Sequence, residues 1–516
     1  MRSSRSSASW PEGSNRGPVP WLGGFAQPGS FVVTIVEQLR RIVGDSNVFV
    51  TAGDLAGYRA DNGHRVDGGI VCVARPADTE QVSQVVSACA LAKIPIVPRG
   101  GGTGFAGGSL PIEGQQVVVV SLERMRRIRS LDTVGDTVVA DAGCTLHQVQ
   151  QAALDAGRTL GLDHGGAGSS CIGGNIATNA GGNNVIRYGM AREQVLGLEA
   201  VFADGSIMSP PSVLRKSNAG YDLRDLLVGS EGTLALITAV ALKLRMAPVA
   251  SKTALLGLSS PQSAVDLLVS AKAMLGDSLV AFELMSRAAL QFHLSHVGAT
   301  REPLDEPTPW LVLLEAESTT RFMDLDAAID ALTEHAFADG LVRTGCVAAS
   351  IAQRRALWAL REGIAIAMDE ARYPIVKTDT AVPIGEVPAF IERVTNDVER
   401  CVPGARPIFF GHVGDGNIHL NVLPPIAMPD KEFRQQFSTL AQLVEDIALS
   451  LGGTVSAEHG IGQAKLDALG RMLKPCEVSL MRGIKFAFDP ADSFNPGKVI
   501  PPAPRLLQPT TGFQER

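Results

Sequence analysis

The stretch IPIVPRGGGTGFAGG, residues 94–108, joins a short apolar run to a cluster of glycines. Residues 102–107 match the pattern GxGxxG, but the next segment, SLPIEGQQVVVVSL, predicts a turn and a strand where a Rossmann fingerprint requires a helix. No Gly-Lys-Ser/Thr follows, which excludes a Walker A loop. Five glycines within residues 100–107 still expose backbone N–H groups that can form a nest for anionic oxygens. The stretch therefore predicts a strand that ends in a pyrophosphate-binding loop.

Two more glycine-rich loops lie in the same part of the chain. Residues 162–189 hold eight glycines and four asparagines, and residues 226–238, LLVGSEGTLALIT, form another tight turn before a strand. Long glycine loops usually indicate turns or disorder, but the first is bracketed by ordered-looking segments and is rich in amide donors. We therefore expect it to wrap a large polar ligand. Three such loops in one domain predict a dinucleotide site.

The 516 residues are enough for two or three domains. Helical and strand patterns alternate over residues 31–248, which we predict to be one α+β domain. Amphipathic helices and strands with few glycines then predict a separate mixed α/β domain over 249–425 and a mostly helical region over 426–502. Residues 1–30, rich in Ser, Arg, Gly and Pro, are predicted to be a disordered leader, and 503–516 a tail.

Composition restricts the class of partner and the compartment. A net charge of -7 gives no electrostatic footprint for nucleic acid or an anionic membrane, so a small-molecule partner is expected. No apolar run is long enough to span a bilayer, and the seven scattered cysteines lack CxxC spacing, which favours a reducing compartment. We predict a soluble cytoplasmic protein. The leader resembles a mitochondrial transit peptide in its Arg and Ser content, but it has too much Pro and Gly for an amphipathic helix. Nothing in the sequence indicates an oligomeric state.

The richest chemical pattern is PIFFGHVGDGNIHLNV, residues 407–422, together with SAEHGIG, residues 456–462. The first reads as a hairpin around Gly-Asp-Gly-Asn, which places His412 and His419 on facing strands. A lone histidine is usually a satisfied half-buried residue. Two on one hairpin, with Glu458 and His459 elsewhere, instead match an open catalytic metal site with three ligands and one spare imidazole. Such ligands suit Zn²⁺, and Mn²⁺, Fe²⁺ and Co²⁺ remain alternatives.

These motifs together resemble a known family. PRGGGTG, IGGNIATNAGG, RYG, GYDLRDLLVGSEGTL, GHVGDGNIHLN, AEHGIG and FNPGK occur in this order over roughly residues 45–500. They resemble the FAD-dependent oxidoreductases of the vanillyl-alcohol-oxidase/p-cresol-methylhydroxylase (PCMH) type. Within that family the chain is similar to D-2-hydroxyacid dehydrogenases, and SLVAFELM, ALWALREGI and HLNV resemble the 2-hydroxyglutarate enzymes more than the D-lactate enzymes. The implied fold is a two-subdomain FAD-binding domain, a substrate (cap) domain and a C-terminal helical region.

The resemblance also implies which residues hold FAD. Many relatives carry a flavin-linking histidine after the first glycine run, and Thr103 stands there in this chain, so noncovalent FAD is expected. Cys171 is expected to be a packing or loop residue rather than a flavin attachment. The implied cofactor-binding residues are Arg99, Gly100, Gly101, Gly102, Thr103, Gly104, Ser169, Ser170, Gly173, Gly174, Asn175, Thr178, Asn179, Gly181, Gly182 and Ile237.

The implied reaction is oxidation of a D-2-hydroxyacid to the 2-oxoacid by hydride transfer to flavin N5. The resemblance makes His412, His419 and Glu458 the metal ligands and His459 the catalytic base, which also contacts the substrate. A bound metal lowers the pKa of a hydroxyl that it coordinates, and a histidine with an ordinary pKa of about 6.5 can take the proton. The resemblance further makes Arg361, Lys377 and Asn421 substrate-binding residues. Without it, the two cations would be read as ordinary surface charges.

Several alternatives stay open at this point. The 2-hydroxyglutarate enzymes place a hydroxyl residue one helical turn after the arginine, where this chain has Ala365. D-2-hydroxyglutarate is the preferred substrate, with D-lactate and D-malate as alternatives. An oxygen-using oxidase and a non-catalytic flavin-binding protein are the other functions considered. The resemblance implies an electron-transferring flavoprotein or a quinone as electron acceptor.

Overall fold

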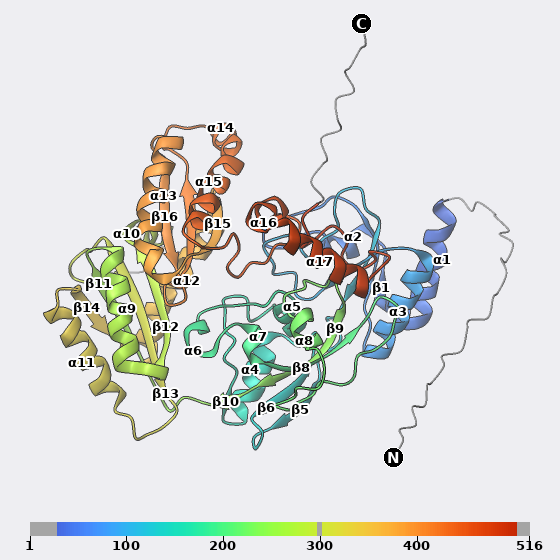
Figure 1. The fold of residues 1–516 in the computed structure, drawn as a ribbon, viewed down its shortest axis with the longest axis horizontal. Helices are drawn as coiled ribbons and strands as arrows, with labels where there is room; N and C mark the ends of the chain where they lie inside the picture. The colour runs from blue at the N-terminus through green and yellow to red at the C-terminus, as the bar shows by residue number, and fades with distance from the viewer. Residues whose placement is uncertain (1–27, 297–301, 503–516) are drawn as a thin grey trace, which may run out of the picture.

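The computed structural model describes residues 28–296 and 302–502, which form two lobes (Figure 1). One lobe carries two four-stranded sheets and the glycine-rich loops, and the other carries a seven-stranded sheet flanked by helices. Of the predicted leader and tail, only residues 28–30, which begin α1 (Pro28–Val43), lie within the described residues.

The first sheet holds the strand that precedes the first glycine loop. Its order is β1 (Val48–Phe49), β2 (Ile70–Ala74), β4 (Val117–Ser121) and β3 (Ile96–Arg99). β2, β4 and β3 run parallel, so β4 is buried on both faces and reads as an unbroken valine run. Helices α1 and α3 (Thr79–Ala92) contribute to the core on one face, and Asp78 caps α3 by accepting from the Gln81 N–H.

The second sheet is antiparallel and completes this lobe. Its order is β5 (Ile128–Asp132), β6 (Thr137–Asp141), β9 (Leu236–Lys243) and β8 (Val195–Val201). A short pair, β7 (Arg158–Thr159) and β10 (Arg245–Met246), leads toward the other lobe. The lobe also holds α2 (Ala52–Leu55), α4 (Leu146–Asp155), α5 (Ile172–Ala177), α7 (Ala191–Gln194) and α8 (Leu223–Leu227), whereas α6 (Val185–Tyr188) packs against the seven-stranded sheet of the other lobe.

The seven-stranded sheet of the second lobe is antiparallel throughout. Its order is β14 (Val342–Val347), β11 (Ala250–Leu258), β13 (Trp310–Ser318), β12 (Leu279–Ser286), β16 (Arg406–Gly411), β17 (Asn417–Leu423) and β15 (Val376–Ala381). Apolar residues alternate between its faces: Leu256 joins one core, whereas Leu255 joins the other. Helices α9 (Pro261–Leu275), α11 (Leu325–Ala338), α13 (Val387–Cys401) and α15 (Phe437–Ser450) cover one face, and α10 (Arg287–His296) and α12 (Ile351–Glu370) cover the other.

The C-terminal helices divide between the two lobes. α14 (Asp430–Gln435) and α15 stay on the second lobe, whereas α16 (Leu466–Met472) and α17 (Pro475–Phe488) lie over the first (Figure 1). Phe494 is fully buried in the first lobe's core, and its neighbour Asn495 donates a backbone hydrogen bond to Ile96 in β3. Lys485 of α17 donates to the carbonyl of Thr233. The last described segment is therefore part of the glycine-loop lobe.

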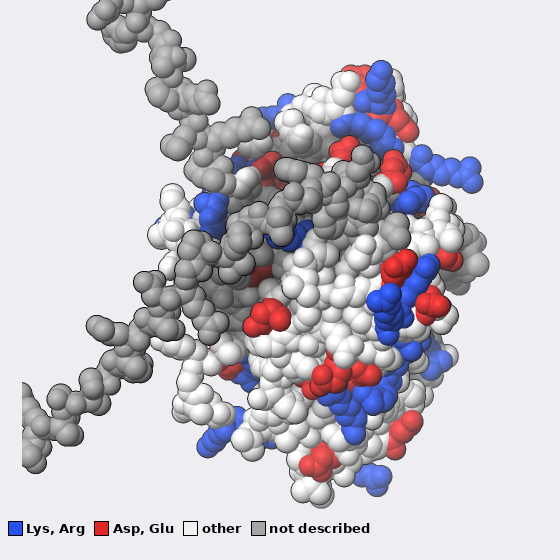
Figure 2. Space-filling model, turned by 90° about the vertical axis from the view of Figure 1, so that its right-hand side faces the viewer, with Lys and Arg blue, Asp and Glu red and all other residues white. Residues whose placement is uncertain are grey.

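Charged side chains of both signs lie on the face of the molecule shown in Figure 2, where Lys and Arg are interspersed with Asp and Glu. Within residues 28–296 and 302–502, no helix is both long enough and apolar enough to cross a bilayer.

Candidate active site

The predicted hairpin is formed by β16 and β17, and it places two histidines beside Glu458. The Nε2 atoms of His412 and His419 lie 3.8 and 3.3 Å from Glu458 Oε1. His412 directly follows β16, while His419 pairs with Phe410 across the hairpin. The turn requires Gly416, whose φ is +89° and whose added Cβ would lie 2.3 Å from the Val382 carbonyl oxygen. The hairpin therefore brings together the three ligands predicted from the sequence.

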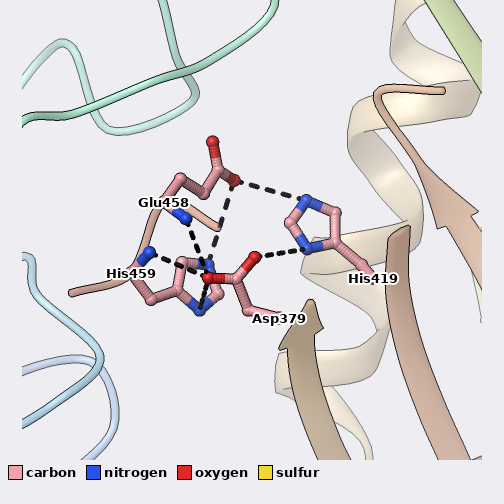
Figure 3. A group of neighbouring side chains, drawn as sticks. All are labelled: Asp379, His419, Glu458 and His459. Carbon is pink, nitrogen blue, oxygen red and sulfur yellow. Dashed lines mark hydrogen bonds and ion pairs between the residues drawn. The ribbon is translucent and has the colours of Figure 1, made fainter. Parts of the chain in front are cut away.

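Asp379 attaches the Glu458–His459 turn to this hairpin. It stands opposite His419 in the β15–β17 pair and is only 1% exposed. Its Oδ2 accepts the backbone N–H groups of Glu458 and His459 at 3.0 and 2.9 Å, and Oδ1 accepts from Asn417 at 3.0 Å. Figure 3 shows Asp379 and His419 converging with Glu458 and His459, which are neighbours on one loop.

This group has the chemistry of a cation site. One ligand-type atom from each of Asp379, His419, Glu458 and His459 lies within 4.8 Å of the others. His412 adds an imidazole nitrogen from the other side of Glu458. Two imidazoles and a carboxylate match the donor set of a catalytic zinc site that keeps an open position. The residues present therefore fit a divalent metal ion.

Electrostatics keep the carboxylates of this group ionised. Burial alone raises the pKa of Glu458, but hydrogen bonds and charges from His412 and His419 outweigh it and hold the pKa well below its ordinary value. Burial also opposes ionisation of Asp379, but the neighbouring His459, when it is protonated, and the Lys465 ammonium lower its pKa. The site is thus a group of ionised carboxylates surrounded by imidazoles.

His459 is the most accessible member of the group, with 28% of its side chain exposed. Its ring stacks on Phe105, at a centroid distance of 4.6 Å, and on His419, at 5.7 Å. Burial lowers the pKa of His459 more than the facing Asp379 raises it. His459 is therefore neutral at neutral pH and can accept a proton.

The two predicted substrate-binding cations have different environments. Arg361 in α12 is 6% exposed, donates from Nε to Glu283 Oε2 at 2.8 Å and lies over the Phe410 ring. It is not the surface charge that composition alone would suggest. Lys377 in β15 is 44% exposed at its side chain and forms an ion pair with Asp369. Asn421, which is 4% exposed, stands opposite Lys377 in the β15–β17 pair.

The first two glycine loops pack directly against each other. A Cβ added to Gly101 would lie 2.0 Å from the Ser169 carbonyl oxygen, and one added to Gly100 would lie 3.1 Å from Cys171 Cβ. By contrast, a Cβ on Gly104 or Gly174 would meet nothing within 4 Å. The loops therefore close against each other on one side and leave an open surface on the other, which fits a cofactor.

Unpaired polar atoms lie in the same region. Ser109 Oγ, Asn495 Oδ1 and Lys498 Nζ are buried without a hydrogen-bond partner among the described residues. Asn495 also donates from Nδ2 to the Gly108 carbonyl, which places the C-terminal segment beside the first glycine loop. Buried polar atoms are nearly always paired, so this region fits a bound polar group such as FAD.

The predicted cofactor residue Arg99 has a specific structural role. Its guanidinium donates to the carbonyl oxygens of Gly57 and Ala60 at 3.0 and 2.8 Å and lies over the Tyr58 ring. A Cβ on Gly102 would lie 2.2 Å from Arg99 Nη2. Arg99 thus fastens the 57–60 turn beneath the glycine loop, where its contacts are with protein rather than with an open surface.

The other predicted cofactor residues lie on the two loops and one strand. Asn175 links Ser170 and His164, and Asn179 accepts the Arg192 N–H. Gly173 packs on Ala142, Gly182 on Asp163, and Ile237 is buried in β9. Thr103 accepts from the Asn62 side chain, Thr178 donates to the Gly174 carbonyl, and Ser169 is exposed at the loop surface.

Gly181 joins the loop site to the histidine site. A Cβ at this position would lie 3.2 Å from Glu458 Oε2. Phe105, which directly follows Gly104, stacks on His459. Segments from both lobes therefore meet at one place, where a cofactor on the loops and a substrate beside the histidines would be adjacent.

Known protein families match both lobes. The "FAD binding domain" family matches residues 70–209, and the "FAD linked oxidases, C-terminal domain" family matches residues 247–499. A D-2-hydroxyglutarate dehydrogenase of Stutzerimonas stutzeri is 35% identical over 468 residues, which is 90% of this chain and 98% of the relative. The mitochondrial D-2-hydroxyglutarate dehydrogenase of Arabidopsis thaliana is 34% identical over 90% of this chain and 81% of its own length.

The chain belongs to the FAD-linked oxidase family, in the branch of the D-2-hydroxyglutarate dehydrogenases. It is an FAD-dependent oxidoreductase. The cattle mitochondrial D-2-hydroxyglutarate dehydrogenase is 36% identical over 83% of this chain and 76% of the relative.

Solved structures of the same fold support the predicted fold class. p-Cresol methylhydroxylase with bound substrate superposes with a TM-score of 0.72 at 18% identity, over 92% of this chain and 97% of its own. 4-Ethylphenol oxidase from Gulosibacter chungangensis gives 0.71 at 18% identity, over 92% and 98%. These structures confirm the predicted α+β fold of the vanillyl-alcohol-oxidase type. The relatives named above and the FAD-binding family confirm the predicted enzyme class.

The sequence analysis did not single out three residues that contact the predicted site residues: Glu283, Asp379 and Phe105. Glu283 is the only charged residue of β12, LVAFELMS, and a single acid in an otherwise apolar strand was the available signal. Asp379 stands two residues after Lys377, which places both on one face of β15. Phe105 gave no signal beyond its place in the glycine loop.

Proposed function

We propose that this protein oxidises D-2-hydroxyglutarate to 2-oxoglutarate, with noncovalent FAD as hydride acceptor and a divalent metal ion, preferably Zn²⁺, held by His412, His419 and Glu458. The observation that carries the proposal is the convergence of both histidines on one oxygen of Glu458, with His459 beside it. Relatives at 33–37% identity that are named for this reaction support the substrate.

The cofactors would supply two effects: FAD accepts a hydride, and a divalent ion lowers the pKa of a hydroxyl that it coordinates. The remaining tasks belong to the chain. His459 takes the hydroxyl proton, for which its lowered pKa suits it at neutral pH. Asp379 Oδ2, 3.7 Å from His459 Nδ1, stabilises the imidazolium that forms. Phe105 and His419 hold the ring in place by stacking on it.

Arg361 and Lys377 would bind the carboxylates of the substrate, with Asn421 beside them. Glu283 accepts the Nε–H of Arg361, so the Nη1–Nη2 edge can form a bidentate pair with a distal carboxylate. Lys377 would leave Asp369 and act as a point charge. Two separate cations suit a dicarboxylate substrate, because each cation can bind one of its two carboxylates.

Ala365 favours a second candidate substrate, D-malate or D-lactate. The position is exposed in α12, so the missing hydroxyl leaves no buried partner unsatisfied. Its loss then costs the net value of one hydrogen bond, about 0.5 to 1.5 kcal/mol. That loss is too small to exclude D-2-hydroxyglutarate as substrate. It does reduce the difference in binding free energy between D-2-hydroxyglutarate and a shorter acid.

We further propose the FAD contacts predicted from the sequence, an electron-transferring flavoprotein or a quinone as electron acceptor, and the cytoplasm as location. Thr103 stands where covalent relatives have histidine, and Cys171 is buried against Gly100, so neither offers a flavin linkage. All seven cysteines are free, as expected in a reducing compartment. The plant and cattle relatives are named mitochondrial, so the mitochondrial matrix is the competing location.

Anaerobic bleaching of the flavin tests the substrate. D-2-Hydroxyglutarate should bleach the purified yellow protein faster than D-malate, D-lactate or the L-enantiomers do. Arg361→Gln should slow bleaching by D-2-hydroxyglutarate. Arg354→Gln serves as the matched control, because Arg354 lies on the same helix and pairs with Glu315 instead of Glu283. Bleaching by D-lactate alone would transfer the proposal to that acid, and bleaching by none of them would overturn it.

A further inference from the structure

Glu283 occupies an unusual place for a charged side chain. It lies in β12, at the centre of the seven-stranded sheet, and only 1% of it is exposed. Burial of a carboxylate is costly unless both oxygens are bonded. The structure provides two partners, and each belongs to a different part of the proposed active site.

One oxygen of Glu283 contacts a proposed metal ligand. Oε1 lies 2.7 Å from Nδ1 of His412, which is itself 7% exposed. When Nδ1 carries the proton and donates to the carboxylate, Nε2 is the nitrogen left for ligation. That nitrogen is the one that faces Glu458 Oε1. Glu283 therefore selects the tautomer in which His412 can bind a cation.

The other oxygen contacts the proposed substrate arginine. Oε2 accepts from Arg361 Nε at 2.8 Å, while the guanidinium carbon lies 5.1 Å from the Phe410 ring centroid. A guanidinium held at Nε and over an aromatic face has its remaining edge fixed in direction. The charges of the pair cancel locally, so Arg361 can stay buried in the absence of substrate.

We infer that Glu283 is a positioning residue that couples the metal ligand to the substrate clamp, setting the tautomer of His412 and the direction of Arg361 together. This inference rests on the proposed function, because it needs a metal at His412 and a carboxylate at Arg361. It assigns to one buried side chain an effect on both metal affinity and the choice between substrates with and without a distal carboxylate.

Glu283→Gln tests the coupling because an amide cannot accept on both sides. If the amide oxygen accepts from His412, the amide NH₂ group faces the Arg361 Nε–H, and two donors meet. In the reverse orientation the NH₂ group faces His412 Nδ1, which must then be unprotonated, and this is the wrong tautomer for ligation through Nε2. In FAD-loaded protein stripped with a chelator, calorimetric titration with Zn²⁺ should show affinity reduced by about 10- to 100-fold. The preference for D-2-hydroxyglutarate over D-lactate in anaerobic flavin reduction should fall as well.

Glu315→Gln is the matched control. Glu315 is 3% exposed on the neighbouring strand β13, and it accepts from Arg354 of the same helix α12. This variant should lower thermal stability yet keep the Zn²⁺ affinity and the substrate preference, as a purely structural carboxylate would. Loss of both in Glu315→Gln would overturn the specific role of Glu283.

Folded, FAD-loaded Glu283→Gln with unchanged Zn²⁺ affinity and unchanged substrate preference would overturn the inference while leaving the proposed function intact. If Glu283→Gln does not fold, Glu283→Asp decides, because its shorter side chain keeps the charge but cannot reach both partners. Unchanged behaviour of Glu283→Asp likewise overturns the inference. A wild-type protein that neither binds Zn²⁺ nor bleaches with any D-2-hydroxyacid overturns the proposed function, and this inference with it.

Discussion

Replacing Asp379 by Asn should weaken metal binding strongly while leaving FAD in place. The aspartate accepts three hydrogen bonds, from the backbone N–H groups of Glu458 and His459 and from the Asn417 side chain. Asn has the same shape but only one acceptor oxygen and no charge. The substitution therefore loosens the turn that carries Glu458 without opening a cavity.

The size of the effect follows from these contacts. Hydrogen bonds to a charged acceptor contribute about 1.5 to 3 kcal/mol, against about 0.5 to 1.5 for neutral pairs, so each of the two backbone bonds weakens by about 1 kcal/mol. The Asn417 bond is lost as well, because two NH₂ groups then face each other. The two backbone bonds, which position the turn that carries Glu458, together account for about 2 kcal/mol, or about 30-fold in metal affinity, and the lost Asn417 bond increases this loss.

Calorimetric titration of chelator-stripped, FAD-loaded protein with Zn²⁺ measures this loss directly. Asp415→Asn provides the matched control, because Asp415 lies in the same hairpin and burial raises its pKa to about 6. A raised folded-state pKa means that ionised Asp415 destabilises the fold above pH 6, so its neutral replacement should keep metal affinity and not lower stability. Wild-type Zn²⁺ affinity in folded Asp379→Asn would refute the reasoning.

Four other outcomes are expected. His459→Gln should retain FAD and metal but lose about 10²- to 10⁴-fold in the rate of flavin reduction, and a wild-type rate in stopped flow would contradict its role as base. Burial lowers the pKa of His459, and only the neutral ring accepts a proton. As the pH decreases, kcat/KM should therefore stay constant down to pH 7 and fall in a single step below about pH 6.5. A step above pH 7 would contradict this assignment. Dialysis against a chelator should abolish turnover with FAD still bound, and Zn²⁺ or Mn²⁺ should restore it; unaffected rates would make the His/Glu cluster structural. Gly101→Ala should purify without flavin colour, because its Cβ would lie 2.0 Å from the Ser169 carbonyl oxygen, whereas Gly114→Ala, which meets nothing within 4 Å, should retain more colour despite its positive φ.

The local signals in the sequence were strong enough to predict the fold and the centre of the site. Glycine loops have a backbone requirement that composition reveals, and the Gly-Asp-Gly-Asn turn determined which strands carry His412 and His419. The family resemblance then supplied the α+β fold of the vanillyl-alcohol-oxidase type, which the solved structures bear out.

Contacts between residues distant in sequence could not be predicted from the sequence. Glu283 lies 129 residues from His412 and 78 from Arg361, and no local pattern joins three such positions. Asp379 and the Glu458–His459 turn meet only because β15 pairs with β17 and an isolated bridge joins Ala381 to Thr454. The motif around Arg99 predicted a place beside the cofactor. The direction of the Arg99 side chain instead depends on the 57–60 turn, which no sequence motif marks.

The return of the last described segment to the first lobe has a consequence for biosynthesis. Phe494 completes a core built mostly from residues before 245, and Asn495 bonds the carbonyls of Gly108 and Glu231. A ribosome that has made the first 250 residues has therefore produced every glycine loop but not the segment that closes the core beside them. The second lobe, by contrast, is continuous in sequence from β11 to α15. Tight binding of FAD is then expected only after the last described segment has been synthesised, so a chain truncated before Phe494 should be released as a colourless, protease-sensitive product.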